Sequence, residues 1–259
     1  TDLVDAWKAD EAVNCTSEAS VNDQGSGHGV HVAGIIAGSD NDFGVVGVAP
    51  NAKCYAIRVL DNSGSGSYDT IAAGLRKAID LDVDIINMSL GAPSEPPAFI
   101  HDLIKEAVSK GIVVLAAAGN DSHAVNYPAR YDEVIAVAAL DESGNLATFT
   151  SRDFTVDIVA PGTNIYSTHL NNNYCKMSGT SQSAPFVAGI CALIKAALKN
   201  QNLLPEFGNQ FCQEDMMVAL RNISSLQNYQ VQPGEEQNWG PGVPKLANID
   251  WSNITVKKS

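Results

Sequence analysis

The chain has 259 residues, of which 45% are hydrophobic, enough to bury one large core in one or two domains. Its formal net charge of −13 argues against nucleic-acid and anionic-membrane partners, and no run of about 18 apolar residues predicts a membrane span. No signal peptide is recognisable from Thr1 onward, so we expect either a cytosolic chain or one that has already been processed.

The five cysteines are scattered and form no Cys-x-x-Cys pair of the kind that suggests a zinc or redox site. They are Cys15, Cys54, Cys175, Cys191 and Cys212. Cys191 falls on the apolar face of an expected helix, so we interpret it as a packed thiol. The cysteines therefore do not decide the cellular compartment.

The first segment, Thr1 to Asp23, is polar, and its spacing is compatible with a short helix at Val4–Ala12. A sharper signal follows in the sequence Gly25-Ser-Gly-His-Gly-Val-His-Val-Ala-Gly-Ile-Ile-Ala-Gly38, where His28 stands at a glycine-rich entrance to a helix of small residues. His31 comes three residues later, and such a pair could also bind zinc. No nearby Glu or Cys completes a zinc site, which disfavours that alternative.

The loop from Ser39 to Pro50 is rich in oxygen donors. The triplet Asp40, Asn41 and Asp42, followed by Gly44, could wrap a hard cation. A solvated acidic turn is the alternative interpretation.

Strands and helices alternate through the middle of the chain. We expect buried strands at Ala52–Leu60, Val83–Met88, Ile112–Ala117, Val134–Ala139 and Val156–Val159, and helices at Tyr68–Leu81 and Phe99–Lys110. This order indicates βαβ units and a mostly parallel sheet covered on both faces. Reactive groups gather beyond the carboxyl ends of such strands, which is where Gly91, Gly119 and Asn120 fall.

A second helix of small apolar residues is expected from Ala184 to about Leu198, with Ser181 at its mouth. Unpaired backbone N–H groups and the positive end of the helix dipole favour developing negative charge at that position. Pro185 is compatible with the first helical turn, which has no use for its missing N–H. An ordinary serine N-cap is the alternative to a reactive hydroxyl.

Three motifs occur in order: Gly-His-Gly-Val-His-Val-Ala-Gly with His28, Ala-Ala-Ala-Gly-Asn with Asn120, and Gly-Thr-Ser-Gln-Ser-Ala-Pro with Ser181. Together they resemble the subtilisin-like serine proteases, and the bacterial secreted subtilisins most, from Thr1 to about Leu198. The resemblance implies one peptidase domain over residues 1–259, folded as a three-layer α/β/α sandwich with a mostly parallel central sheet. It also implies an extracellular, monomeric enzyme that acts on polypeptide substrates.

The resemblance assigns roles to these residues. Ser181 would be the nucleophile and His28 the general base, while the Asn120 side chain and the Ser181 backbone N–H would bind the oxyanion. The substrate would add as a strand between Gly64-Ser65-Gly66 and Ser89-Leu90-Gly91. The first subsite would be lined by Ala117, Ala118 and Gly119, with Asn126 near its base and Asp121 at its rim. We expect this pocket to be shallow, polar and tolerant of basic side chains.

In the family, the catalytic aspartate stands at the end of the first strand, directly after an apolar run. This sequence contains no apolar run followed by Asp-Ser-Gly or Asp-Thr-Gly. The segment Thr1-Asp2-Leu3 is similar to the family's His-Pro-Asp-Leu segment, which places the catalytic aspartate before Thr1. Asp5 is the rival within the chain, and Asp23 resembles the aspartate that commonly precedes the catalytic histidine. Two explanations follow. Either the chain is processed and retains its first strand non-covalently, or it is a silent pseudoprotease that binds peptides. We favour the first, because a sheet that lacks this strand would expose both neighbouring strands.

The loop Ser39–Val45 is similar to the calcium loop of the family. The resemblance implies a Ca²⁺ ion held by the carboxylate of Asp2, the side-chain oxygen of Asn41 and the carbonyls of Ser39, Phe43 and Val45. Gln182 stands where many subtilisins carry a methionine beside the nucleophile, which predicts activity that survives peroxide unless Cys175 reacts.

Overall fold

The computed structural model describes residues 2, 3, 6, 8, 11–21, 25–200, 212–225 and 243–244. Asp5 and Asp23 lie outside the described residues, so neither assignment is tested. Of the helix expected over residues 4–12, only residues 6, 8, 11 and 12 are described, and none of these four is α-helical. The single domain over residues 1–259 also stays a prediction.

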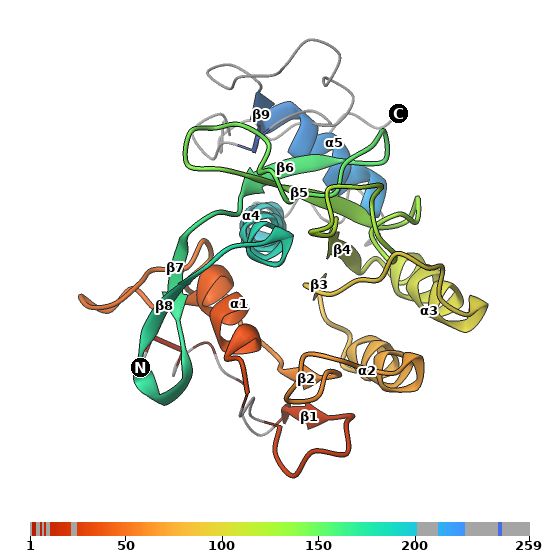
Figure 1. The fold of residues 1–259 in the computed structure, drawn as a ribbon, viewed down its shortest axis with the longest axis horizontal. Helices are drawn as coiled ribbons and strands as arrows, with labels where there is room; N and C mark the ends of the chain where they lie inside the picture. Colours follow the sequence, from red (N-terminus) through yellow and green to blue (C-terminus); the bar gives the residue numbers. More distant parts are fainter. Residues whose placement is uncertain are drawn as a thin grey trace.

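Four parallel strands form the central sheet (Figure 1). They lie in the order β3 (Ile85–Met88), β4 (Val113–Ala117), β5 (Ile135–Leu140) and β6 (Ile158–Pro161). Each matches a strand expected from the sequence, with bounds that differ by no more than two residues. The buried apolar runs therefore located the sheet correctly, and the predicted parallel pairing is confirmed.

The strand expected at Ala52–Leu60 is much shorter in the structure. Only β2 (Ile57–Arg58) remains, and it pairs in parallel with β1 (Val13–Asn14) in a separate two-stranded sheet. Around Cys54 the chain still exchanges hydrogen bonds with Ala6 and Lys8, but the partner segment turns at Glu11. The ladder is interrupted because the two segments run side by side only in part.

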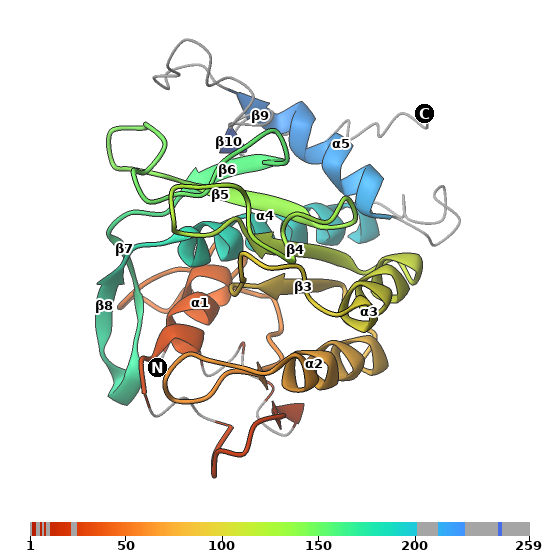
Figure 2. The ribbon, with the colours of Figure 1, turned by 45° about the vertical axis from the view of Figure 1, so that its right-hand side comes forward.

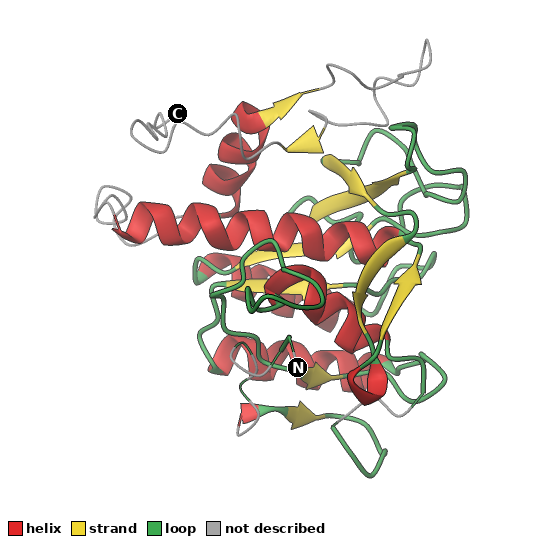
Figure 3. Cartoon of the chain, turned by 90° about the vertical axis from the view of Figure 1, so that its left-hand side faces the viewer, coloured by secondary structure: helices red, strands yellow, loops and turns green. Residues whose placement is uncertain are grey.

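Helices cover both faces of the sheet (Figures 2 and 3). On one face α2 (Tyr68–Asp80) and α3 (Ala98–Ser109) enclose one apolar core, and on the other α4 (Thr180–Asn200) and α5 (Gln213–Ile223) enclose a second. Alternation along β4 divides its side chains between them: Val114 and Ala116 belong to the first core, and Leu115 to the second. The expected three-layer α/β/α sandwich is confirmed.

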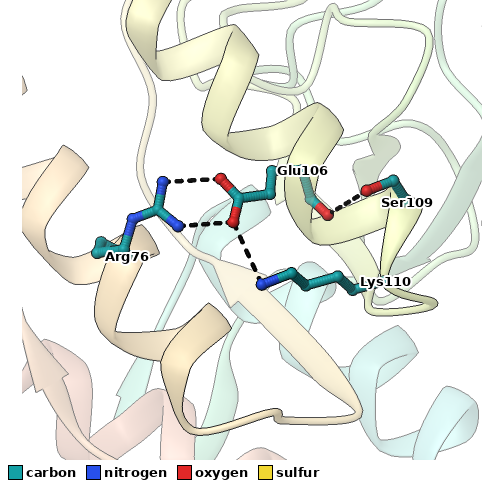
Figure 4. Close-up of polar contacts among 4 residues, drawn as sticks. All are labelled: Arg76, Glu106, Ser109 and Lys110. Carbon is teal, nitrogen blue, oxygen red and sulfur yellow. Dashed lines mark hydrogen bonds and ion pairs between the residues drawn. The ribbon is translucent and has the colours of Figure 1, made fainter.

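Polar contacts on the outer surface join α2 to α3. The guanidinium of Arg76 donates to both carboxylate oxygens of Glu106, at 2.6 and 2.7 Å, and Lys110 approaches the same carboxylate at 3.2 Å (Figure 4). These cations lower the pKa of Glu106 to about 2. The cluster is solvent-exposed, so it adds little to stability compared with the apolar contacts beneath it.

Helix α4 runs through the middle of the second core. By length and composition alone it could cross a membrane, but most of it is buried against the sheet, as expected for the core helix of a folded domain. It begins at Thr180, four residues before the predicted start at Ala184. The reason is distant in sequence, because the Thr180 N–H donates to Oδ1 of Asn120 at 2.9 Å.

A hairpin that the sequence did not predict covers helix α1 (His28–Ala37). It consists of β7 (Ile165–Thr168) and β8 (Tyr174–Met177), and it leads directly to α4. The hydroxyls of Ser167 and Thr168 donate to the carbonyls of His31 and Val30, each at 2.8 Å. Strands β9 (Ser224–Ser225) and β10 (Val243–Pro244), which pair antiparallel, were not predicted either.

Candidate active site

Ser181 lies in the first turn of α4, and its hydroxyl donates to the carbonyl of Ser89 at 3.2 Å. The hydroxyl of Ser89 in turn donates to the Ser181 carbonyl at 2.9 Å. The alternative of an N-cap is wrong, because a capping hydroxyl precedes the helix and accepts an N–H, whereas Ser181 is inside the helix and donates. These contacts hold the start of α4 against the carboxyl end of β3.

Asn120 follows β4 and has a fixed orientation. Its Oδ1 accepts hydrogen bonds from the N–H of Thr180 at 2.9 Å and from the hydroxyl of Thr180 at 3.1 Å. Oδ1 is therefore occupied, and the amide nitrogen is the group left to donate elsewhere. Thr180, which the sequence did not single out, also accepts the Gly119 N–H at 3.1 Å and so ties both segments together.

A cavity of about 380 Å³ opens beside Ser181. Its lining comes from the ends of β3 and β4 and from the start of α4: Leu90, Gly91, Ala117, Gly119, Asn120, Asp121, Asn126, Thr180 and Ser181. Ala118 does not line this cavity, because it is buried behind it, donating to Val137 and accepting from the Asn126 N–H. Segments far apart in sequence thus converge where the predicted first subsite lies.

Gly119 forms part of the wall of this cavity and has no room for a side chain. Its φ of 115° is in the region that favours glycine. A Cβ at this position would lie 2.5 Å from Nδ2 of Asn126 and 2.7 Å from the hydroxyl of Ser151. The buried Asn126 also donates through Nδ2 to both carboxylate oxygens of Asp121, at 3.3 Å each. No local pattern in the sequence indicated Ser151.

His28 is the first residue of α1, preceded by Gly27 with a φ of 69°. A side chain on Gly27 would lie 2.5 Å from the ring of His169, so this entrance requires glycine. A second cavity of about 1400 Å³ brings together the predicted residues of the cleft. It is lined, among others, by His28, Gly64, Ser65, Gly66, Ser89, Leu90, Gly91 and Ser181. His28 and Ser181 therefore line one continuous space.

His31 is buried, and its Nε2 lies 3.0 Å from the carbonyl of Ile165 and 3.3 Å from that of Cys175. Burial lowers the pKa of His31 below its ordinary value, despite the opposing effect of these two contacts. Both contacts occupy Nε2, while Nδ1 is buried without a hydrogen-bond partner. The described part of the chain contains no group of three or more His, Cys, Asp or Glu side chains placed to hold a metal.

Three of the predicted calcium residues, Ser39, Asn41 and Val45, contact Asp2, whose side chain is buried. Its Oδ2 accepts the Val45 N–H at 2.7 Å and the hydroxyl of Tyr174 at 2.9 Å. Its Oδ1 lies 3.4 Å from Nδ2 of Asn41, and its backbone carbonyl accepts the Ser39 N–H at 2.6 Å. The Oδ1 atom of Asn41 is buried without a hydrogen-bond partner, which suits an oxygen that coordinates a cation.

Two other predicted features can be compared with the structure. The Phe43 side chain is largely exposed, so it does not pack into the loop interior. Cys191 is a packed thiol, as predicted, and burial raises its pKa to about 12. All five cysteines are unpaired.

Comparison with known proteins gives one consistent result. The sequence profile of the subtilase family matches residues 2–224. Subtilisin DY of Bacillus licheniformis is 48% identical over 183 residues, which cover 69% of this chain and 66% of that protein. Subtilisin Savinase of Lederbergia lenta is 46% identical over 179 residues, or 69% of this chain and 66% of the relative. A thermostable alkaline protease of Halalkalibacterium halodurans is 47% identical over 182 residues, or 70% of this chain and 50% of the relative. The match spans only part of each of these proteins.

Proposed function

Because this chain belongs to the subtilase family, we propose that it is a serine endopeptidase that hydrolyses polypeptides at Ser181. The observation that carries the proposal is the orientation of Asn120. Thr180 donates two hydrogen bonds to Oδ1 of Asn120, which leaves the amide nitrogen of Asn120 to donate to a developing oxyanion. Asn120 lines the same cavity as Ser181.

The chemistry follows from three side chains. For attack, the Ser181 hydroxyl gives up its hydrogen bond to the Ser89 carbonyl and donates instead to the imidazole of His28. The imidazole accepts the hydroxyl proton and later protonates the leaving amine. The negative oxygen of the intermediate is bound by the Asn120 amide and by the backbone N–H of Ser181 in the first turn of α4. The substrate lies extended between Gly64–Gly66 and Ser89–Gly91, which line the larger cavity.

We further propose that an additional strand, supplied by this polypeptide or by a companion peptide, occupies the larger cavity between β2 and β3. Among the described strands, β2 pairs only with β1 and β3 only with β4, so each has one unpaired edge. Apolar side chains such as Ile57, Val59 and Ile85 line the space between those edges. An unpaired edge on both sides of an apolar cavity favours insertion of a strand. The resemblance places the triad aspartate at the end of such a strand.

Calcium is part of the proposal. Asp2 and Asn41 would hold the ion through side-chain oxygens, and Ser39, Phe43 and Val45 through carbonyls, all of them hard ligands that suit Ca²⁺. The buried, unpartnered Oδ1 of Asn41 supports this assignment. A bound ion would cross-link the N-terminal segment to the loop after α1. An extracellular, monomeric state is also proposed, with membership of the subtilase family as its support.

Labelling with a fluorophosphonate tests the activity directly, because only an activated serine reacts quickly with this probe. We expect rapid labelling that Ser181→Ala abolishes and that Ser178→Ala, a change of an exposed serine in the same segment, leaves intact. Asn120→Ala should lower turnover about 10²–10³-fold, the loss already measured at the corresponding asparagine of a subtilisin. Slow labelling equal to that of a denatured control would instead indicate a silent, peptide-binding relative.

Native and denaturing mass spectra test whether the inserted strand is a companion peptide. A companion peptide would raise the native mass above the denatured mass of the chain, because denaturation releases it. Equal native and denatured masses, in a preparation that labels rapidly, would contradict a companion peptide while leaving the peptidase assignment in place.

A further inference from the structure

We infer that His169, where β7 turns toward β8, is a positioning residue for the proposed general base His28. The inference rests on the proposed function and adds a residue to it. The hairpin that carries His169 lies along α1 (Figures 1 and 2). His169 is not among the described residues that line the larger cavity with His28 and Ser181, so it acts on turnover through its neighbours and not through the substrate.

The backbone that carries His28 has little stiffness of its own. Gly25, Gly27 and Gly29 surround it, and glycine is the residue with the most backbone freedom. Gly27, the residue before α1, has a φ of 69° and no side chain with which to cap the helix. The position of the His28 imidazole is therefore set by contacts from other parts of the fold.

Ser26 connects His169 to His28. Nε2 of His169 lies 3.0 Å from the carbonyl of Ser26, and because a carbonyl can only accept, Nε2 is the donor. The hydroxyl of Ser26 accepts the His28 N–H at 3.2 Å. One serine thus bonds to His169 through its backbone and to His28 through its side chain. A displacement of His169 therefore reaches the group that holds the His28 backbone.

The imidazole of His169 also packs directly on Gly27. A Cβ at this glycine would lie 2.5 Å from Nε2 and 2.6 Å from Cδ2 of His169. Gly27 is buried although Ser26 before it is exposed, as expected where a ring covers the backbone. His169 therefore restrains two successive residues before His28, one by a hydrogen bond and one by packing.

The hairpin that carries His169 is itself anchored to α1. The hydroxyls of Ser167 and Thr168 donate to carbonyls within the helix, each at 2.8 Å. The His169 N–H donates to the carbonyl of Asn173 at 2.7 Å and closes the turn between the two strands. His169 is therefore held firmly enough to fix the segment that precedes the helix.

A purely structural role of His169, as a stabiliser of the hairpin, is the competing explanation. The test measures kcat and KM with acetyl-Ala-Ala-Pro-Ala p-nitroanilide. His169→Leu removes the donor and should lower kcat about three- to tenfold, the range expected for one hydrogen bond, with KM unchanged. His169→Gln should recover most of this loss, because Nε2 of glutamine is the same number of bonds from Cα as Nε2 of histidine.

Thr168→Val is the matched control. It keeps the shape of the side chain and removes a hydrogen bond of the same hairpin that ends on the Val30 carbonyl, inside α1. It should lower the melting temperature and leave kcat unchanged. A merely structural role would instead give His169→Leu the same profile as this control.

Ser26→Ala breaks the connection at its other end, since it removes the hydroxyl that accepts the His28 N–H. It should also lower kcat. The double variant of Ser26→Ala with His169→Leu should lose little more than the larger single loss, because both changes interrupt the same chain of contacts. Ser26→Ala also supplies the kcat test if His169→Leu does not fold.

An unchanged kcat in His169→Leu, a loss that His169→Gln does not restore, or an equal loss in Thr168→Val would overturn the inference. Losses that add fully in the double variant would also contradict it. Fluorophosphonate labelling that is rapid in the wild type and equally rapid in His169→Leu would reject the role of His169 and leave the proposed function in place. Absence of labelling and turnover in the wild type would overturn the proposed function and the inference with it.

Discussion

Asp157 has the most strongly perturbed carboxylate near the sheet, and we predict that replacing it with asparagine stabilises the protein at alkaline pH. It immediately precedes β6, and its Oδ2 accepts the Ala136 N–H at 2.9 Å. Burial raises the pKa of Asp157 from 3.8 to about 6, although the Ala136 contact and the positive charge of Arg221 oppose the shift. A shift of roughly two units corresponds to about 3 kcal/mol at most. Because the side chain is only partly enclosed, we expect about 1–2 kcal/mol.

The sign follows from the direction of the shift. The folded-state pKa lies above the unfolded one, so the protonated Asp157 contributes stability that is fully present below about pH 4. That contribution is lost as the pH rises through about 6, where the ionised carboxylate becomes destabilising. An asparagine in its place would stay neutral at every pH and could still accept the Ala136 N–H. Asp157→Asn should therefore raise the free energy of unfolding at pH 8 and leave it nearly unchanged below about pH 4.

Urea unfolding followed by circular dichroism measures this effect, in a Ser181→Ala background that prevents self-digestion. Asp153→Asn is the matched control, because that nearby aspartate is perturbed in the opposite direction. Burial alone would raise the pKa of Asp153, but hydrogen bonds from Thr155 and Val125 and the charge of Arg130 lower it overall. Its ionised form contributes stability that is lost as the pH falls, so Asp153→Asn should destabilise the protein at pH 8. The reasoning fails if Asp157→Asn destabilises at pH 8, or if its effect is the same on both sides of pH 6.

Three further predictions concern the site and its supports. Gly119→Ala places a Cβ 2.5 Å from Asn126 at a residue with a positive φ, which costs about 1–3 kcal/mol of strain. We therefore expect the melting temperature to fall by several degrees and labelling of Ser181 to slow. An unchanged melting curve would contradict this prediction. Calcium at a hundred times its dissociation constant from this site should raise the free energy of unfolding of the wild type by about 2.7 kcal/mol, and Asp2→Asn should remove most of this gain. An equal gain in both proteins would place the ion elsewhere. Gln182 offers no thioether, so activity should survive mild peroxide, and inactivation with Cys175 unmodified by mass would refute this.

The parts of the fold that the sequence predicted are those governed by local pattern. Ile112–Ala117 is a continuous apolar run that follows Gly111, and Val113–Ala117 within it forms a fully buried strand. Leu75 and Ile79 have helical spacing, and both are buried in α2. Such signals need no information about the rest of the chain, which is why the four main strands and the helices between them were located within a few residues.

The parts that escaped prediction depend on partners far away in sequence. Helix α4 begins early because Asn120 binds Thr180, which is 60 residues away. The hairpin is held by Ser167 and Thr168, whose hydroxyls bond to carbonyls more than 130 residues earlier. Ser151 orients Asp121 from a loop that has no motif of its own. No periodicity encodes contacts of this kind, because they exist only after the chain has folded.

The bond between Asp2 and Tyr174 joins positions 172 residues apart, and this distance has a kinetic consequence. Closing a loop of that length costs about 4–5 kcal/mol of chain entropy, so the contact cannot nucleate folding and forms only after the sheet and α4 are in place. The same contact should be among the first to open in native-state fluctuations. The amides of Ser39 and Val45, which depend on Asp2 for their acceptors, should therefore exchange hydrogen with solvent well before those of β4.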